Sequence, residues 1–277
     1  MERPKVVVVM PGLNVAGTLE RTVRAIPEGS ADVILLVDDG STDDTVEVAR
    51  SLGIACISHA ENRGYGAAQK TGFREALALG ADVAVMVHPD FQYKPELVPA
   101  MAAMVTPGEY DVVLGSRILL GGALAGGMPR WKYVANRALT LAENLAMGTR
   151  VSEFHTGYRA YSRRALSTLP LAGNRNDFAF DSEILAQAAF QGLAIGELSC
   201  PANYFDEMQT ITLLPGIRYG FACLGIARRA ALHRLAARTG LPTGSERFDP
   251  SSPGLTAWTA GRWSIPPSGD AWSRPAP

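Results

Sequence analysis

Two patterns of apolar and polar residues alternate along the first two hundred positions of the chain. Val-rich runs without polar alternation, such as 5–10 and 33–37, are typical of strands buried on both faces. Between such runs, apolar residues recur three or four positions apart, which is the period of a helix with one buried face. The pattern therefore predicts an α/β protein with a Rossmann-like, mostly parallel central sheet flanked by helices.

The predicted elements can be assigned by residue. We expect strands at 5–10, 33–37, 54–57, 83–87, 112–114, 158–161 and 194–200. We expect helices at 19–26, around 46–52, and at 66–79, 95–105, 131–147, 181–191 and 217–237. Ser41 and Asp44 have the spacing of a capping box that opens the second helix, whereas the glycines of 118–129 predict a mobile loop.

Three regions are predicted from composition. Residues 1–215 form a single domain, residues 216–240 a basic amphipathic helix, and the Pro-, Ser- and Gly-rich segment 241–277 a disordered tail. The net charge of -1 hides an asymmetry, because residues from 217 onward carry 8 Arg against 3 acidic residues. Such a basic helix is either a solvated face or a peripheral contact with the inner face of a membrane.

Other features narrow the class of protein. No window approaches about 18 uninterrupted apolar residues, so no membrane span is expected. The sequence pI of about 6.4 and the lack of an aromatic-interleaved basic tract argue against nucleic-acid binding. An odd number of widely spaced cysteines argues against a zinc site and a disulfide framework, and favours a cytoplasmic protein. These cysteines are Cys56, Cys200 and Cys223.

Carboxylates follow the second predicted strand. Asp38 and Asp39 lie at its carboxyl end, where open α/β sheets bind ligands, and a carboxylate there can accept hydrogen bonds from a nucleobase or ribose. Asp43 and Asp44 come later and are expected to cap the next helix instead. We therefore expect ligand contact from the first pair only.

A second polar cluster, His88-Pro89-Asp90-Phe91-Gln92, follows the strand predicted at 83–87. In an extended segment, alternate side chains point the same way, so His88, Asp90 and Gln92 would share one face. One carboxylate is enough for Mg²⁺ or Mn²⁺, because these ions complete their shells with water and substrate phosphates. We predict a divalent-metal site here; the alternative is an ordinary Pro-Asp turn.

Several motifs in register resemble family 2 glycosyltransferases, especially dolichol-phosphate mannosyltransferases and related polyprenyl-phosphate glycosyltransferases. The resemblance covers about residues 5–215 and implies a GT-A fold. It rests on Pro11-Gly12-Leu13-Asn14, Asp38-Asp39-Gly40-Ser41, Asn62-Arg63-Gly64-Tyr65-Gly66, Asp90 with Gln92, and Gly115-Ser116-Arg117.

The resemblance implies a GDP- or UDP-sugar donor and a divalent cation, Mg²⁺ or Mn²⁺. Asp90 would hold the cation with help from Gln92 and His88, although the family usually has an Asp where His88 stands. Arg117 would neutralise phosphate charge. The donor pocket would be formed by Pro11, Leu13, Asn14, Val37, Asp38, Asp39, Arg63, Gly64, His88 and Pro89.

The sequence leaves two alternatives for the acceptor, a polyprenyl phosphate and a hydroxyl group. A hydroxyl needs a general base, for which Asp181 or Glu183 is the candidate, whereas a phosphate needs none; both acids are equally typical of a helix first turn. Asp206 and Glu207 stand where dolichol-phosphate mannosyltransferases carry an Arg and a Lys. Segment 155–159 is expected to shape the acceptor side.

The resemblance thus implies a metal-dependent hexosyltransferase that inverts the sugar's configuration. Arg117, Arg130, Arg159 and the basic helix are the candidate cations for an acceptor phosphate. The alternatives are a nucleotidyltransferase, which usually has a basic Gly-rich loop after the first strand, and a non-catalytic nucleotide-sugar-binding protein. No partner motif accompanies two histidines, which are expected at the surface: His59 and His233.

Overall fold

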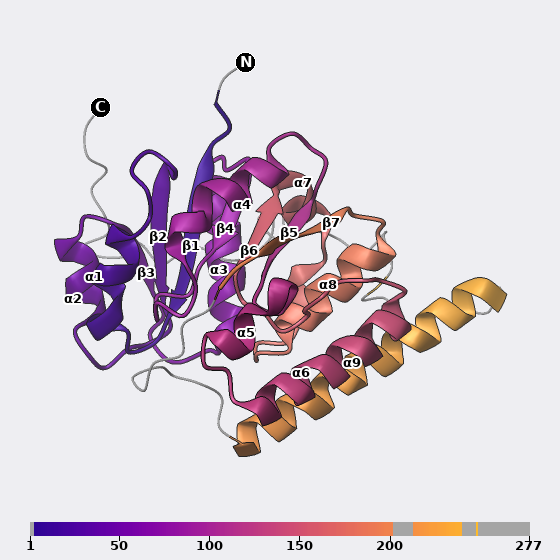
Figure 1. The fold of residues 1–277 in the computed structure, drawn as a ribbon. Coiled ribbons are helices and arrows are strands. Elements are labelled where there is room, and N and C mark those ends of the chain that lie inside the picture. Colours follow the sequence, from indigo (N-terminus) through magenta and orange to yellow (C-terminus); the bar gives the residue numbers. More distant parts are fainter. Residues whose placement is uncertain (1–2, 202–212, 240–247, 249–277) are drawn as a thin grey trace.

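A seven-stranded sheet forms the centre of the molecule (Figure 1). The computed structural model describes residues 3–201, 213–239 and 248. The strand order is β3-β2-β1-β4-β6-β5-β7, and every neighbouring pair is parallel except those that β6 makes with β4 and β5. The strands are β1 (Val6–Gly12), β2 (Val33–Asp38), β3 (Ala55–Ser58), β4 (Val83–Met86), β5 (Val112–Ser116), β6 (Arg159–Ser162) and β7 (Ile195–Ser199).

Helices cover both faces of this sheet. The α-helices are α1 (Ala16–Arg24), α2 (Thr45–Ser51), α3 (Tyr65–Ala78), α4 (Val98–Val105), α5 (Gly122–Ala125), α6 (Arg130–Met147), α7 (Arg163–Thr168), α8 (Phe180–Phe190) and α9 (Leu213–Thr239). Single 3₁₀ turns lie at Pro95–Leu97, Leu119–Gly121 and Leu171–Gly173. The predicted α/β class and mostly parallel sheet are confirmed.

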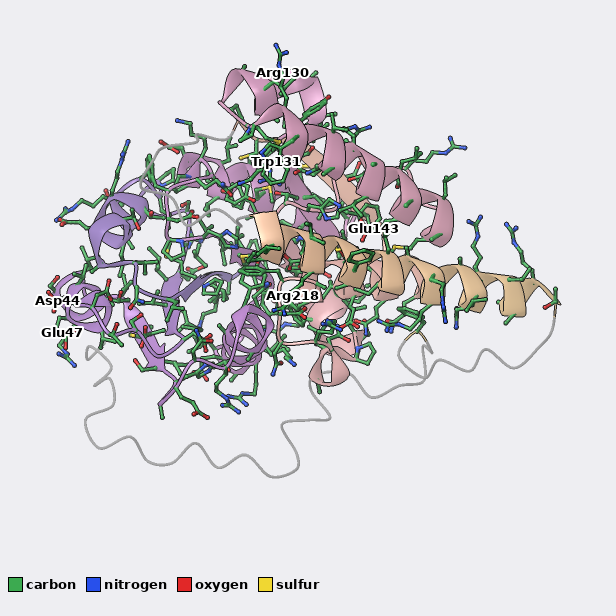
Figure 2. All side chains as sticks on the ribbon, turned by 90° about the horizontal axis from the view of Figure 1, so that it is seen from below. Asp44, Glu47, Arg130, Trp131, Glu143 and Arg218 are labelled. Carbon is green, nitrogen blue, oxygen red and sulfur yellow. The ribbon has the colours of Figure 1, made fainter. Side chains whose placement is uncertain are left out.

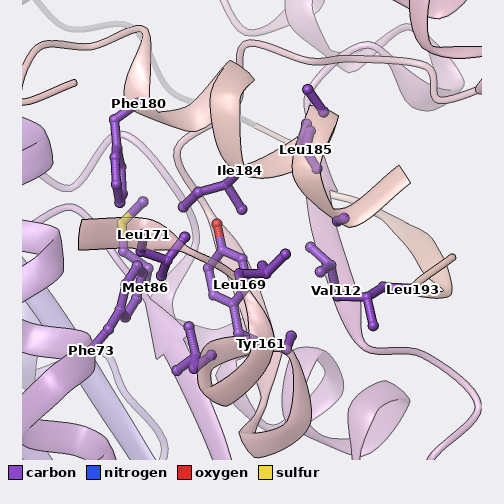
Figure 3. Packing of buried hydrophobic residues seen from close by; sticks show 14 of the residues in the cluster. Phe73, Met86, Val112, Tyr161, Leu169, Leu171, Phe180, Ile184, Leu185 and Leu193 are labelled. Carbon is purple, nitrogen blue, oxygen red and sulfur yellow. The ribbon is translucent and has the colours of Figure 1, made fainter. Parts of the chain in front are cut away.

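The alternation of side chains along β1 builds two hydrophobic cores. Val7 and Val9 point to one face and pack with residues of α3, α7 and α8, including Phe73 and Ile184 (Figure 3). Val8 and Met10 point to the opposite face and pack with residues of α1, α2 and α4. Because both faces of β1 are buried, its sequence is continuously apolar rather than alternating.

Helices α6 and α9 lie side by side along one edge of the molecule, and α9 also packs on α8 (Figure 1). None of the described helices is long and apolar enough to cross a membrane. Residues Asp206 and Glu207, like the tail from 241 except Phe248, lie outside the described residues.

Two local predictions are wrong. Helix α2 begins at Thr45, and its N-cap Asp44 makes no side-chain cap bond. Ser41 does not form a capping box, because its hydroxyl instead accepts the backbone N–H of Asn14 at 2.8 Å. Segment 118–129 is not a continuous loop: it contains a 3₁₀ turn and the short helix α5, whose Ala123 is fully buried.

Candidate active site

A cleft of about 630 Å³ opens at the carboxyl ends of β1, β2 and β4 and runs toward α6 and α9. Parallel strands that end at one edge leave their following loops there, which is the usual ligand position in such sheets. Of the predicted site residues, those that line the cleft are Pro11, Leu13, Asp39, Gly64, His88, Pro89, Asp90, Gln92, Arg117 and Asp181.

Asp39 organises the end of the cleft where the sequence predicts that the donor binds, which we call the donor end. Its carboxylate accepts the backbone N–H groups of Arg63 and Gly64 at 3.0 and 2.8 Å, and lies 2.7 Å from Nδ1 of His59. These bonds fix the loop before α3, where Gly64 has a φ of 96° that favours glycine. His59 is buried, with Nε2 3.0 Å from the Thr71 hydroxyl, so its predicted surface position is wrong.

Four predicted donor residues lie beside the cleft without lining it. Val37 is buried in the sheet, and Asp38 accepts the backbone N–H of Ser41 at 3.1 Å. Asn14 has a φ of 53°, and its amide oxygen accepts the N–H of Thr42 at 2.8 Å, which ties two loops together. Arg63 has an exposed side chain. These residues support the walls of the donor end.

Segment 88–92 forms a turn and not an extended run, so the predicted alternation of side chains is wrong. Strand β4 ends at Met86, and Phe91 has a φ of 58°. The Phe91 ring stacks under the guanidinium of Arg21 at 3.9 Å, which holds it out of the cleft. The turn still brings His88, Asp90 and Gln92 to the same cleft.

His88 belongs to a hydrogen-bonded chain. Tyr65 donates its hydroxyl proton to Asp181 Oδ2 at 2.9 Å, and its oxygen lies 2.9 Å from Nε2 of His88. Because the single phenolic proton is used on Asp181, Nε2 of His88 carries a proton and Nδ1 keeps a lone pair. Burial lowers the pKa of His88, although the charges of Asp90 and Asp181 oppose this effect. The ring is therefore neutral and able to accept a cation.

This donor set fits a hard or borderline cation that also binds phosphate. Asp90 uses one oxygen, Oδ1, to accept the N–H of Gln92 at 3.0 Å and offers a carboxylate to the cleft. Among the described residues no three His, Cys, Asp or Glu side chains gather into a ready-made metal site. A cation here would be held by Asp90 and His88 and would need water and substrate phosphate oxygens to complete its shell.

Arg117 and Lys132 bring two cations to the cleft. The Arg117 guanidinium pairs with the buried carboxylate of Glu153 and donates to the carbonyl of His155 at 2.6 Å. Burial would raise the pKa of Glu153, but the charge and hydrogen bonds of Arg117 lower it overall. Burial and the nearby Arg117 lower the pKa of Lys132. Lys132 could not be predicted from the sequence, because a single Lys in the first turn of a helix belongs to no motif.

The two acidic candidates are separated. Asp181 lies in the cleft, where Tyr65 and Gln69 donate to its two oxygens. Glu183 does not line the cleft: it is buried and accepts from the Arg175 backbone at 2.7 Å and from Arg229 at 3.2 Å. Asp181 is therefore the acid in position to meet a substrate.

Arg159 is wholly buried beneath Asp181. Its guanidinium donates to the backbone carbonyls of Phe154, Thr156 and Asp181 at 2.7–2.8 Å. The prediction that Arg159 supplies charge to an acceptor phosphate is wrong, because its guanidinium is wholly buried and, unlike that of Arg117, does not line the cleft.

The far end of the cleft is mostly apolar. Helices α6 and α9, with the loop before α6, bring Met128, Trp131, Leu139 and Tyr219 to it. His155 also lines this end, and its Nδ1 lies 2.7 Å from the Tyr219 hydroxyl. Figure 2 shows the two helices from below, with Trp131 labelled on α6.

Comparison with known proteins gives related enzymes over most of the chain. An undecaprenyl-phosphate mannosyltransferase of Micrococcus luteus is 28% identical over 81% of this chain and 93% of its own length. A UDP-N-acetylglucosamine–dolichyl-phosphate N-acetylglucosaminyltransferase of Methanococcus voltae is 28% identical over 72% of this chain and 85% of its own. A dolichyl-phosphate hexose transferase of Haloferax volcanii is 34% identical over 67% of this chain and 75% of its own length.

Solved structures support the fold. Glucosyl-3-phosphoglycerate synthase of Mycobacterium tuberculosis, crystallised with Mn²⁺ and UDP-glucose, superposes with a TM-score of 0.59 at 24% identity, covering 86% of this chain and 80% of that one. At this identity the likeness shows a common GT-A architecture. The model of the family described as "Glycosyl transferase family 2" matches residues 7–169, which is more than half of the chain. The chain therefore belongs to glycosyl transferase family 2 and is a glycosyltransferase, as the motifs predicted.

Proposed function

We propose that this enzyme transfers a hexose from a GDP- or UDP-sugar to the phosphate of a polyprenyl phosphate, with Mg²⁺ or Mn²⁺ as cofactor. One observation carries the proposal: a single cleft is lined by carboxylates at the strand ends, by the cations Arg117 and Lys132, and by apolar side chains of α6 and α9. Such a set of groups suits a nucleotide diphosphate, a second phosphate and a hydrocarbon chain. The names of the relatives from Methanococcus voltae and Micrococcus luteus support it.

The donor end would bind the nucleotide sugar. Asp39 would accept hydrogen bonds from the base or ribose, and its bonds to the backbone of Arg63 and Gly64 would hold the loop before α3 beside the nucleotide. Asp90 and His88 would hold the cation, which when bound neutralises the charge that develops on the leaving diphosphate. The Tyr65 hydroxyl keeps the His88 ring in one orientation and tautomer.

The acceptor phosphate would meet Arg117 and Lys132. A phosphate is already ionised, so one of its oxygens can attack the anomeric carbon without a general base. The new carbon–oxygen bond forms as the bond to the diphosphate breaks on the opposite face, so the configuration inverts and a nucleoside diphosphate leaves. Asp181, fixed by Tyr65 and Gln69, would border the sugar.

The hydrocarbon chain would leave along α6 and α9. Exposed apolar side chains on each helix are separated by three, four, seven or eight positions, which places them on one side of that helix. We call this set of exposed apolar side chains the lipid face. Helix α9 also carries five Arg and no acidic residue. We propose that the lipid face lies on an anionic membrane surface. Its members are Trp131, Val134, Leu141, Leu145, Leu214, Ile217, Phe221, Leu224, Leu232 and Leu235.

A hydroxyl acceptor is the second candidate, because Asp181 lines the cleft and could serve as its base. Labelled sugar should pass to a short polyprenyl phosphate and not to the matching polyprenol. Asp181→Asn should lose little turnover with a phosphate acceptor, whereas a hydroxyl acceptor predicts a loss of about 10²–10⁴-fold.

The acceptor cations give a separate test. Lys132→Ala removes a charged hydrogen bond to phosphate and should raise the acceptor KM by about 10–100-fold with unchanged donor affinity. Arg137→Ala is the matched control, since Arg137 lies on the same helix but does not line the cleft. Transfer to the polyprenol, together with a large loss in Asp181→Asn, would contradict the proposed acceptor.

A further inference from the structure

A buried acid lies behind the acceptor end of the cleft, outside the machinery described above. Glu143 of α6 is 0% exposed, and neither of its carboxyl oxygens has a well-formed hydrogen bond among the described residues. Its Oε2 lies 3.3 Å from Nε2 of His155, which also lacks a well-formed partner. Figure 2 labels Glu143 where α6 runs beside α9.

Other polar groups face this acid from each neighbouring element. Ser182 of α8 approaches the carboxyl group, and Arg159 of β6 acts on it by its charge. Cys223 of α9 lies 3.5 Å from the Ser182 hydroxyl. Tyr219, also on α9, bonds to Nδ1 of His155 at 2.7 Å and lines the cleft. The 3.3 Å approach of Glu143 to His155, whose Nδ1 bonds to Tyr219, thus connects this acid to two residues that line the cleft.

The hydrogen atoms on this path allow two arrangements. If Glu143 is protonated, it donates to Nε2 of His155, whose Nδ1–H then donates to the Tyr219 oxygen. The phenolic proton of Tyr219 is then available to a ligand in the cleft. If Glu143 is ionised, Nε2 carries the proton, Nδ1 accepts, and the phenolic proton is used on His155.

We propose that Glu143 is a positioning residue that decides, through His155, whether Tyr219 donates its hydroxyl proton to the acceptor phosphate. This inference rests on the proposed function, because it assigns Tyr219 to that acceptor. Without a ligand, Cys223 is the neighbour that takes the Tyr219 hydrogen bond. A thiol is a weak acceptor, and an ionised phosphate replaces it readily.

At neutral pH, burial favours the arrangement in which Glu143 is protonated and the Tyr219 hydroxyl can donate to a ligand. It raises the pKa of Glu143 to about 8, an effect that Ser182 and Arg159 reduce without reversing. Burial lowers the pKa of His155 to about 3, so the imidazole stays neutral and can exchange tautomers. The ionisation of Glu143 therefore switches the path just above neutral pH.

Steady-state kinetics with a short polyprenyl phosphate test this relay. The wild-type acceptor KM should rise about tenfold between pH 6.5 and 9.5, as a hydrogen bond to a charged group is lost. Tyr219→Phe should show the high value throughout, and Glu143→Gln should show no such rise because its amide does not ionise. The ionisation of the acceptor phosphate changes KM equally in all three proteins, so a comparison of their pH profiles removes this effect. Donor affinity should stay constant in all three proteins.

A measurement that needs no acceptor separates the relay from the proposed function. Nitrogen NMR of His155 should report the Nδ1–H tautomer at pH 6.5 and the Nε2–H tautomer at pH 9.5 in the wild type, with no change in Glu143→Gln. Parallel KM profiles in wild type and Glu143→Gln, or one tautomer at both pH values, would overturn the relay. Absence of transfer to polyprenyl phosphate would overturn the proposed function alone.

Discussion

Glu143 and His155 make an ionisable pair that is neutral when folded, and its protons predict how stability depends on pH. In the unfolded chain the Glu titrates near pH 4.5 and the His near 6.5, whereas in the folded protein their pKa values are about 8 and about 3. Between pH 4.5 and 6.5 each state holds one proton, on Glu143 when folded and on His155 when unfolded. In that window the pair leaves stability unchanged.

Above pH 6.5 only the folded pair holds a proton, so its contribution to the free energy of unfolding should fall by about 1.4 kcal/mol per pH unit up to pH 8. Glu143→Gln should abolish this fall, because the amide does not titrate. Urea unfolding at several pH values measures both. Glu47→Gln, an exposed position on α2, is the control and should keep the wild-type slope. Equal slopes in both variants would contradict the raised pKa of Glu143.

We expect the dependence of donor binding on the metal to require Asp90. Asp90→Asn removes the carboxylate charge while keeping the side chain's size, so turnover should fall on the order of 10²–10³-fold. Calorimetry of nucleoside diphosphate with and without Mn²⁺ should show that the metal no longer tightens binding. Asp44→Asn, exposed at the start of α2, should behave as wild type. A preserved metal effect in Asp90→Asn would place the cation elsewhere.

At the residue level, motifs predicted many of the residues that line the cleft at the strand ends, but their hydrogen-bond partners could not be predicted. Asp39 was expected from its place after β2, yet its partner His59 comes twenty residues later in a segment without a motif. Arg159 is a similar case, because the sequence does not show whether an Arg side chain is exposed to solvent or donates to three buried carbonyls. Such pairings depend on tertiary contacts that a local pattern does not contain.

At the scale of elements, strands were predicted best, because burial on both faces leaves a continuous apolar run that few other structures share. Predictions failed where a polar side chain had two uses, as at Ser41, whose hydroxyl bonds the chain after β1 instead of capping α2. The cleft shows the same limit: the turn at 88–92 was predicted as extended because the positive φ of Phe91 has no sequence signal.

Close approach of two elements at Gly157 gives an element-scale prediction. A Cβ at this position before β6 would lie 2.4 Å from Cε1 and 2.6 Å from Nε2 of His88. Gly157→Ala should therefore displace the imidazole from Tyr65, lower turnover at least tenfold and destabilise by about 1–3 kcal/mol. Gly17→Ala is the control, because nothing lies within 4 Å of its new Cβ. Wild-type turnover in Gly157→Ala would show that the His88 orientation is unimportant.

At the scale of the molecule, charge and exposed apolar area coincide on α6 and α9. The residues before 217 carry 18 basic and 24 acidic side chains, whereas those from 217 onward carry 8 Arg and 3 acids. An anionic bilayer would attract the basic end and repel the rest, at about 1 kcal/mol for each Arg near the surface. If the proposed membrane contact is made, these charges would orient the molecule with its lipid face toward the bilayer.

This orientation predicts salt-sensitive binding to vesicles that contain anionic lipid, measured by co-sedimentation. Phe221→Ser removes an apolar side chain that is 71% exposed on the lipid face, and should weaken binding severalfold. Leu120→Ser is the control, because Leu120 is equally apolar and 89% exposed but lies on the turn before α5. Both variants should keep the wild-type rate with a water-soluble short-chain acceptor, because neither residue lines the cleft. Equal binding by the two variants, or none by wild type at low salt, would leave the apolar side chains of α6 and α9 without a role at a membrane.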